Sequence, residues 1–547
     1  MSAAIPGSSL NADQPKATST HQPDLEARPA EEGQTHSSSL PIASWDSSHS
    51  FSLKDTDETE AELDERVLQS QPTWSRRLLA FLAKYKLELQ GIEPVPLALR
   101  QDRKWLKVVG LWFSASFNLL LLSTGSIIPF YAISHMAALI AIPLWVALFS
   151  IIPAYICTFG PLTGLRTMVF TRYTFGKYGT ILICILNAAT GIGYSILNAI
   201  TGGQTLSAVS PNGSLTPTVG IVVICIISLV ISFMGIRILG PIEGWVWAPI
   251  LVCFIILTAF AGTGPDGLHL VPSDPANPTT ARGVLGIGAL AAGLVVTYAS
   301  ISMDYSLSLR PTLNRPLFGF LCWLSFLISI AMPLMLGASI AYSAQDIPAW
   351  SEALETSFGT LVNLIYSSHA GGFGRFLTVL LSLSVLSNLT PTFYSFGLTL
   401  QTGLPFRGIS LVPRPAWPIL GFALTLPLAI VGATHFAATL TNFLALIGYW
   451  ASFYSGVILF DHILLRRCDY GSYDPQAWND WGRLPWGAAA ITACICSLGV
   501  IIPSMDQIYF TGPIAQKVGD LGFELGILTT GLVYVPLRLL ERHLSGR

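Results

Sequence analysis

The stretch Gly91–Gly125 reads GIEPVPLALRQDRKWLKVVGLWFSASFNLLLLSTG, and a long apolar segment fills its second half. Ser114, Ser116 and Asn118 lie where this segment would cross the middle of a bilayer. Polar side chains at that depth cost free energy unless a partner satisfies them, so they usually face a packed interior or a binding cavity. The stretch therefore predicts a membrane helix that contributes polar groups to a site. Four basic residues precede the apolar segment: Arg100, Arg103, Lys104 and Lys107.

The composition is that of a membrane protein. The chain has 547 residues, of which 52% are hydrophobic and 11% are charged, and its mean hydropathy is +0.58. Soluble domains carry roughly 25% charged residues. The net charge of −2 argues against a nucleic-acid partner. Residues 1–104 are rich in Ser, Pro, Glu and Asp, which predicts a mostly disordered tail. Within it, residues 74–89 are amphipathic and would form a short helix on the membrane surface or in solvent.

Twelve segments have the length and apolar character of membrane spans, for which about 20 residues are needed. The positive-inside rule places both chain termini in the cytoplasm, because eleven basic loop residues would lie on that side and three on the other. The chain thus divides into a cytoplasmic tail (1–104), a ten-helix transport core (105–460) and a C-terminal part (461–547) with a cytoplasmic loop, two further helices and a short cytoplasmic tail. The predicted spans are 105–133, 137–158, 180–208, 217–235, 242–263, 283–305, 316–342, 374–402, 416–432, 435–460, 485–503 and 520–538. The cytoplasmic basic residues are Arg166, Arg172, Lys177, Arg237, Arg310, Arg315, Arg407, Arg414, Arg466, Arg467 and Arg483, and the external ones are Arg282, Arg375 and Lys517.

Glycine and proline interrupt several of these spans. The sixth span opens with four glycines within eleven residues (283–293), and the eighth carries Pro391. Such interruptions are tolerated in membrane helices where the freed backbone groups line a cavity. Spans 1 and 6, both polar at mid-depth, would be equivalent members of two inverted five-helix repeats, each with a discontinuous helix. This pattern is typical of a secondary transporter.

Polar residues form stripes on spans 1 and 3. Ser114 and Asn118 are four residues apart and share one face of span 1. On span 3, Asn187, Tyr194 and Asn198 share a face with a glycine at position 191. Each asparagine supplies both a donor and an acceptor for the edge of a planar heterocycle, and the tyrosine ring could stack on its face. Interhelical hydrogen bonding and close packing of small residues remain the alternative for both stripes.

Spans 8 and 6 add further polar groups. Span 8 places Asn388 three residues before Pro391, where an amide without a partner would be costly. Span 6 ends with Tyr298 and Asp304, and Asp304 is the one carboxylate placed within a core span. An intramembrane carboxylate indicates proton relay, although an ion pair with the nearby Arg310 would give it a gating role instead.

The sequence carries no signature of enzyme chemistry. It has no phosphate-binding glycine loop followed by lysine, no GxSxG motif and no His/Cys/Glu cluster at metal-ligand spacing. We therefore expect no metal and no cofactor other than a co-transported proton. Asn212, in the Asn-Gly-Ser sequence after span 3, is a candidate N-glycosylation acceptor in an external loop.

Several motifs resemble the fungal purine–cytosine permeases, a branch of the nucleobase–cation symporter family. The resemblance covers roughly residues 90–540 and rests on GIEPVP with LWFSASFN, TFGPLTGLRTMVFTRYTFGKYG, GIGYSILN, MDYS, SNLTPTFYS and FDHILLRRCDYGSYDPQAWNDWGRLPWGAA. It implies the leucine-transporter fold of two inverted five-helix repeats plus two helices. It also implies proton-coupled import of adenine, guanine, hypoxanthine or cytosine across the plasma membrane, with Ser114, Asn198 and Asn388 bonded to the base.

The chain departs from this family pattern at positions that would touch the base. Tyr194 and Tyr298 stand where close relatives carry tryptophan, and Ser116 replaces an asparagine. In span 8, Leu389 and Thr392 also stand in place of asparagines. A site that loses an amide can lose discrimination between heterocycles by 10⁴-fold or more. We therefore expect the chain to have the fold of the family, whereas the resemblance does not predict its exact substrate.

The sequence thus predicts a proton-driven importer of purine bases and cytosine that works by alternating access. Ser114, Asn118, Asn198 and Asn388 would bond the base, and Tyr194 and Tyr298 would stack on it. Its expected partners are a small heterocycle and the lipid bilayer, with no nucleic acid and no obligate protein partner. Two alternatives remain: a symporter of the same fold for a pyridoxine-, allantoin- or metabolite-like heterocycle, and a non-transporting membrane sensor.

Overall fold

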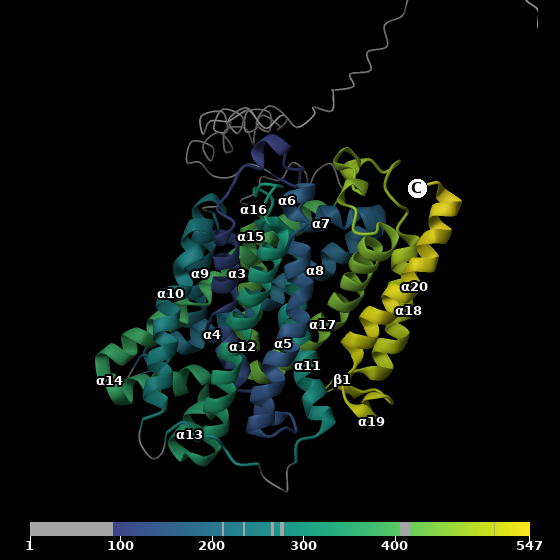
Figure 1. The fold of residues 1–547 in the computed structure, drawn as a ribbon. Coiled ribbons are helices and arrows are strands. Elements are labelled where there is room, and N and C mark those ends of the chain that lie inside the picture. The colour runs from purple at the N-terminus through teal and green to yellow at the C-terminus, as the bar shows by residue number, and fades with distance from the viewer. Residues whose placement is uncertain are drawn as a thin grey trace, which may run out of the picture. The chain divides into compact units, whose positions relative to one another are not determined.

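The computed structural model describes residues 91–547 except 211–212, 234–235, 264–266, 274–277, 405–415 and 508. Most of the predicted tail and the candidate acceptor Asn212 lie outside these residues. Within them the chain is a bundle of helices (Figure 1). We call the end of the bundle with α6 (Gly160–Thr163), α7 (Thr167–Phe170) and the C-terminus the upper face. The opposite end, with α13 (Pro348–Thr356) and α19 (Ala515–Val518), is the lower face.

Span 1 is broken in the middle. A 3₁₀ turn, η1 (Leu97–Leu99), precedes α3 (Leu106–Ser116) and α4 (Leu119–Gly125), which meet at an angle of 48°. Asn118 lies at the break with an extended backbone, and its Oδ1 accepts hydrogen bonds from the backbone N–H groups of Leu120 (2.9 Å) and Leu121 (3.3 Å). An asparagine in this position satisfies donors that a helix start leaves free, so the break costs little even in an apolar setting.

Span 6 is broken as well. It consists of α11 (Ala281–Val296) followed by two 3₁₀ turns, η3 (Thr297–Ser300) and η4 (Ser302–Tyr305). The Thr280 hydroxyl caps the start of α11 by accepting from the Gly283 N–H. The structure therefore interrupts both of the spans that the sequence marked as polar and discontinuous.

The remaining helices surround these two. In the sequence, the elements between the two broken spans are η2 (Ile128–Phe130), α5 (His135–Cys157), α6, α7, α8 (Arg172–Ser207), α9 (Pro217–Ser232) and α10 (Ile236–Ala261). After them come α12 (Arg315–Asp346), α13, α14 (Phe358–Leu383), α15 (Leu386–Gly403), α16 (Ala416–Gly432), η5 (Ala433–His435) and α17 (Phe436–Phe460). The C-terminal part adds a π-helical turn η6 (Asp461–Leu465), η7 (Tyr470–Ser472), η8 (Pro475–Asn479), α18 (Ala488–Ser504), α19 and α20 (Gly522–Ser545). A two-residue antiparallel pairing joins β1 (Asp506–Gln507) to β2 (Phe510–Thr511).

Among the described residues, eight helices are long and apolar enough to cross a membrane, or nine if the bent pair α3–α4 counts as one span. Three shorter apolar helices (α9, α16 and α18) coincide with further predicted spans. Every predicted span therefore contains helix, whereas the number of twelve crossings stays a prediction. The external loop expected between 343 and 373 contains α13 and the first half of α14, which bends at Gly371.

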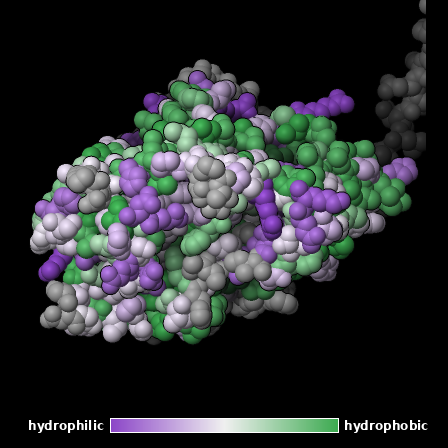
Figure 2. Space-filling view, turned by 90° about the horizontal axis from the view of Figure 1, so that it is seen from below, coloured by the Kyte–Doolittle hydropathy of each residue, from purple (hydrophilic) through white to green (hydrophobic). Residues whose placement is uncertain are grey.

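Close backbone contact holds the broken span 1 against its neighbour. A Cβ atom added to Gly337 on α12 would lie 1.9 Å from the carbonyl oxygen of Leu122 on α4, and one added to Gly125 would lie 2.4 Å from the Leu334 carbonyl oxygen. Small residues at such crossings let membrane helices approach closely. The sides of the bundle are apolar, as on α5, where Leu144 and Ile151 are exposed. Hydrophilic residues gather on the lower face (Figure 2).

Candidate functional site

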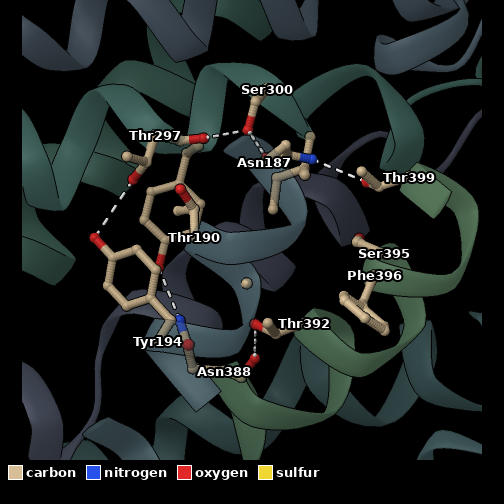
Figure 3. Close-up of a pocket in the computed structure, with 13 residues that line it drawn as sticks. Asn187, Thr190, Tyr194, Thr297, Ser300, Asn388, Thr392, Ser395, Phe396 and Thr399 are labelled. Carbon is tan, nitrogen blue, oxygen red and sulfur yellow. Dashed lines mark hydrogen bonds between the residues drawn. The ribbon is translucent and has the colours of Figure 1, made fainter. Parts of the chain in front are cut away.

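A small cavity lies at the middle of the bundle, between α8, the broken span 6 and α15 (Figure 3). Its volume is about 50 Å³. One water needs about 10–15 Å³ by this measure, so the cavity has room for a few waters. Its walls combine amides, hydroxyls and aromatic rings, a mixture suited to a small polar heterocycle. The lining residues are Asn187, Thr190, Gly191, Tyr194, Thr297, Tyr298, Ser300, Ile301, Asn388, Thr392, Ser395, Phe396 and Thr399.

The Asn388 amide is the hub of this site. Its Nδ2 donates to the carbonyl oxygen of Ala115, at the end of α3, and to the hydroxyl of Tyr298, both at 2.9 Å. Its Oδ1 accepts from Asn198 Nδ2 at 2.8 Å. One buried side chain on α15 thus ties together span 1, span 6 and α8, the elements that the sequence analysis had assigned to one site.

Asn198 has unused hydrogen-bonding capacity. Its Nδ2 also donates to the carbonyl oxygen of Tyr194 at 2.8 Å. Its Oδ1 is buried and has no hydrogen-bond partner among the described residues. A buried acceptor without a donor costs about 1–3 kcal/mol, so a ligand N–H that reached this atom would recover that cost.

Two tyrosine rings stand beside the amide pair. The Tyr194 hydroxyl donates to the Gly293 carbonyl oxygen at 2.8 Å and lies 3.4 Å from the Thr297 hydroxyl, so its ring spans from α8 to span 6 (Figure 3). The Tyr298 ring packs edge-on against Trp112, with centroids 5.7 Å apart. Both rings line the cavity, as stacking residues would.

A second amide closes the end of the cavity nearest the upper face. Asn187 Nδ2 donates to the Thr399 hydroxyl at 2.9 Å, and Asn187 Oδ1 accepts from the Ser300 hydroxyl at 2.6 Å (Figure 3). Asn187 lies eleven residues before Asn198 on α8, which is about three helical turns. It therefore bridges α8, η3 and α15 above the Asn198–Asn388 pair.

Ser114 and Asn118 do not line the cavity in this conformation. The Ser114 hydroxyl accepts from the backbone N–H of Trp247 on α10 at 3.2 Å, and Asn118 caps α4. Conversely, the hydroxyls of Thr190 and Thr297 line the cavity and were not predicted from the sequence, and Thr392, predicted only as the replacement of an asparagine, lines it too. The i, i+3 and i+7 spacing of Thr392, Ser395 and Thr399 on α15 was the signal that could have found that wall.

Asp304 is buried outside the cavity. One of its carboxylate oxygens accepts from the backbone N–H (2.7 Å) and the hydroxyl (3.1 Å) of Thr167, the first residue of α7. The positive charge of Arg166 acts on the same carboxylate. Arg310, the gating partner that the sequence suggested, donates instead to the Gln101 carbonyl oxygen. Asp304 thus joins span 6 to the upper-face helix α7.

Known proteins match this chain over most of its length. Residues 94–526 match the family model described as permease for cytosine/purines, uracil, thiamine, allantoin. A purine-cytosine permease of Emericella nidulans is 31% identical over 472 residues, which cover 85% of this chain and 91% of the relative. A purine-cytosine permease of Saccharomyces cerevisiae is 28% identical over 90% of this chain and 93% of its own length. The vitamin B6 transporter of Saccharomyces cerevisiae is 26% identical over 87% of this chain and 93% of its own length.

Solved structures agree on the fold. Mhp1, a nucleobase-cation-symport-1 family transporter, in a closed conformation with bromovinylhydantoin bound, has a TM-score of 0.62 at 15% identity. The match covers 83% of this chain and 96% of that one. The inward-facing conformation of Mhp1 gives 0.64 at 14% identity, over 84% and 96%. These matches confirm the predicted leucine-transporter-like fold, and the relatives are transporters rather than enzymes. The chain is therefore a multi-pass membrane transporter that belongs to the family of permeases for cytosine, purines, uracil, thiamine and allantoin.

Proposed function

We propose that the chain is a proton-coupled symporter that imports purine bases and cytosine across the plasma membrane, with both of its termini in the cytoplasm. The observation that carries this proposal is the buried Asn198–Asn388 amide pair, which lies beside two tyrosine rings that line the cavity at the break of span 6. The family match and the purine-cytosine permeases among the relatives support it.

A nucleobase could replace some of the hydrogen-bond partners of the Asn198–Asn388 pair. Asn388 accepts from Asn198 and donates to the Tyr298 hydroxyl. A nucleobase edge presents donors and acceptors side by side, so it can replace one protein partner on each side of the Asn388 amide. The hydrogen bonds that the base would form are similar in strength to the buried bonds that it would replace. The base would also supply a donor to Asn198 Oδ1, which has none among the described residues.

Binding requires the bundle to open. A cavity of about 50 Å³ has room for a few waters and not for a purine ring system. In the proposed cycle, span 1 and span 6 move apart at their breaks to admit the base and close again around it. Ser114 and Asn118 flank the break in span 1. Their predicted contacts with the base belong to the opened state and stay a prediction.

Direct uptake tests the proposal. The full chain is expressed in a yeast strain that lacks its own nucleobase permeases, and accumulation of radiolabelled adenine and cytosine is measured with and without a protonophore. We expect accumulation that the protonophore abolishes, and loss of uptake in Asn388→Ala. A matched control is Asn363→Ala, which removes a part-buried amide that donates to the Ala208 carbonyl oxygen, away from the cavity. Near-normal uptake by surface-expressed Asn388→Ala would remove this residue from the site.

A second cargo deserves the same assay because the vitamin B6 transporter is also a relative. The chain lacks amides at Ser116, Leu389 and Thr392, where the family pattern has them. Accumulation of pyridoxine without adenine or cytosine would overturn the nucleobase proposal and retain the transporter. Binding of a heterocycle without accumulation would favour the sensor alternative.

A further inference from the structure

A second cavity, separate from the nucleobase site, opens on the side of the bundle near the upper face. It lies between α5 and the first two turns of α12, with the loop after α17 at its rim, and its volume is about 410 Å³. None of its lining residues borders the central cavity. They are Ile151, Ala154, Tyr155, Thr158, Arg315, Pro316, Gly319, Phe320, Trp323 and Tyr470.

The walls of this cavity continue into the lateral surface of the protein. Ile151 and Phe320 are each 54% exposed, and Leu144 and Leu148 extend the exposed apolar strip along α5 away from the upper face. Because the chain is a multi-pass membrane protein, this strip faces lipid acyl chains. A ligand in the cavity would therefore reach it from the membrane.

The rim toward the upper face is polar and positively charged. Arg315 is exposed, its guanidinium lies 5.2 Å from the centre of the Tyr470 ring, and no carboxylate of the described residues lies within 4 Å of it in an ion pair. The Tyr155 hydroxyl at the rim lies 3.9 Å from Cys468 Sγ. In the sequence Cys468 stands between Arg467 and Asp469, so the positive charge of the cavity lining is that of Arg315. The cavity thus has a cationic, hydroxyl-bearing end and an apolar end.

We infer that this cavity binds an anionic phospholipid of the upper-face leaflet. Its phosphate pairs with Arg315 beside the Tyr155 hydroxyl, and an acyl chain lies along Ile151, Phe320 and Trp323. Basic pockets between membrane helices bind anionic headgroups in this way. A zwitterionic choline lipid would bring its own cation to a rim that already carries positive charge. A water-soluble phosphate would leave the apolar walls without a partner.

Lipid titration of the purified full-length protein tests this inference. The midpoint of thermal unfolding is followed in detergent micelles as dioleoylphosphatidylserine, dioleoylphosphatidylcholine or inorganic phosphate is added. We expect phosphatidylserine to raise the midpoint in a saturable way and the other two to leave it unchanged. Arg315→Gln should weaken the apparent affinity for phosphatidylserine about fivefold, the worth of one basic residue near an anionic lipid. Arg315→Lys should retain it.

The matched control is Arg375→Gln, which removes an exposed arginine on α14 that does not line the cavity and should leave the titration unchanged. Equal affinities of wild type and Arg315→Gln would overturn the inference. So would equal binding of phosphatidylcholine, or a shift produced by inorganic phosphate alone. Should Arg315→Gln not fold, loss of the phosphatidylserine shift in the folded Arg315→Lys variant would overturn it as well.

Discussion

At the scale of single residues, the site depends on amides whose partners are other parts of the protein. Asn388 holds three elements through three hydrogen bonds, so its truncation would remove the tie between them together with the substrate contacts proposed for it. Tyr194 differs, because its hydroxyl bonds the backbone of Gly293, whereas its ring packs edge-on against Phe443 and lines the cavity. Conservative substitutions can therefore separate stacking from structural hydrogen bonding.

Tyr194→Phe keeps the ring and removes the hydroxyl, whereas Tyr194→Leu removes the ring. We expect Tyr194→Phe to transport adenine with a KM close to wild type and to lose about 1 kcal/mol of stability, the net worth of a typical hydrogen bond. Tyr194→Leu should raise the KM by about 5- to 150-fold, because base–aromatic stacking contributes about 1–3 kcal/mol per base. Uptake kinetics and thermal unfolding measure the two effects. Equal KM values for the two variants would contradict a stacking role.

The amides and rings of the site were easier to predict from the sequence than the direction in which each side chain points. Asn198, Asn388, Tyr194 and Tyr298 were predicted as site residues, and the structure brings them together. Ser114 was predicted with them and faces α10 instead. Helical periodicity shows which residues share a face, and it does not show which neighbouring helix that face meets. The hydroxyls of Thr190 and Thr297 were passed over because such groups are common packing residues in membrane helices.

At the scale of elements, breaks in helices were easier to predict than the helices between the seventh and eighth predicted spans. The glycines of span 6 and the polar centre of span 1 indicated discontinuity, and both spans are broken. The segment 343–373 was expected to be a loop because it lies between the predicted spans 316–342 and 374–402. It forms α13 and the first half of α14. A short amphipathic helix gains its stability by packing on other elements, and a membrane-span criterion does not detect that packing.

The bridge made by Asn187 joins three elements at the upper-face end of the cavity. If the base leaves toward this face, the hydrogen bonds from Asn187 to Ser300 and Thr399 must break in every cycle. Asn187→Leu removes the bridge and leaves the Asn198–Asn388 pair intact. We expect the maximal uptake rate to change several-fold while the KM for adenine changes less than twofold. Thr399→Val, which removes one of the two bonds, should give a smaller change. A rise in KM without a change in rate would place Asn187 in base binding instead.

At the scale of the whole molecule, the upper face is closed by contacts between distant segments. The backbone N–H of Val95 donates to the Gly164 carbonyl oxygen at 2.9 Å, and the Arg100 guanidinium donates to the Leu162 carbonyl oxygen at 2.9 Å. The backbone N–H of Asp102 donates to the Ser308 carbonyl oxygen at 2.9 Å. The segment before span 1 therefore connects α6 to the turn after span 6. In the proposed alternating-access cycle, opening this face would require both spans to move relative to α6 and α7.

Asp304 is placed to link protonation to that movement, since it bonds the first residue of α7 from span 6. A protonated carboxyl is a weaker acceptor than a carboxylate and carries no charge for Arg166 to attract. Protonation would therefore loosen span 6 from α7.

Asp304→Asn imitates the protonated form at every pH. We expect the adenine uptake of this variant to be independent of external pH. The variant should let adenine equilibrate across the membrane without accumulating it, and a protonophore should not change this. Asp102→Asn, a carboxylate on the same face that pairs with Lys107, is the control and should keep both dependences. Accumulation by Asp304→Asn that still follows external pH would assign Asp304 to structure alone.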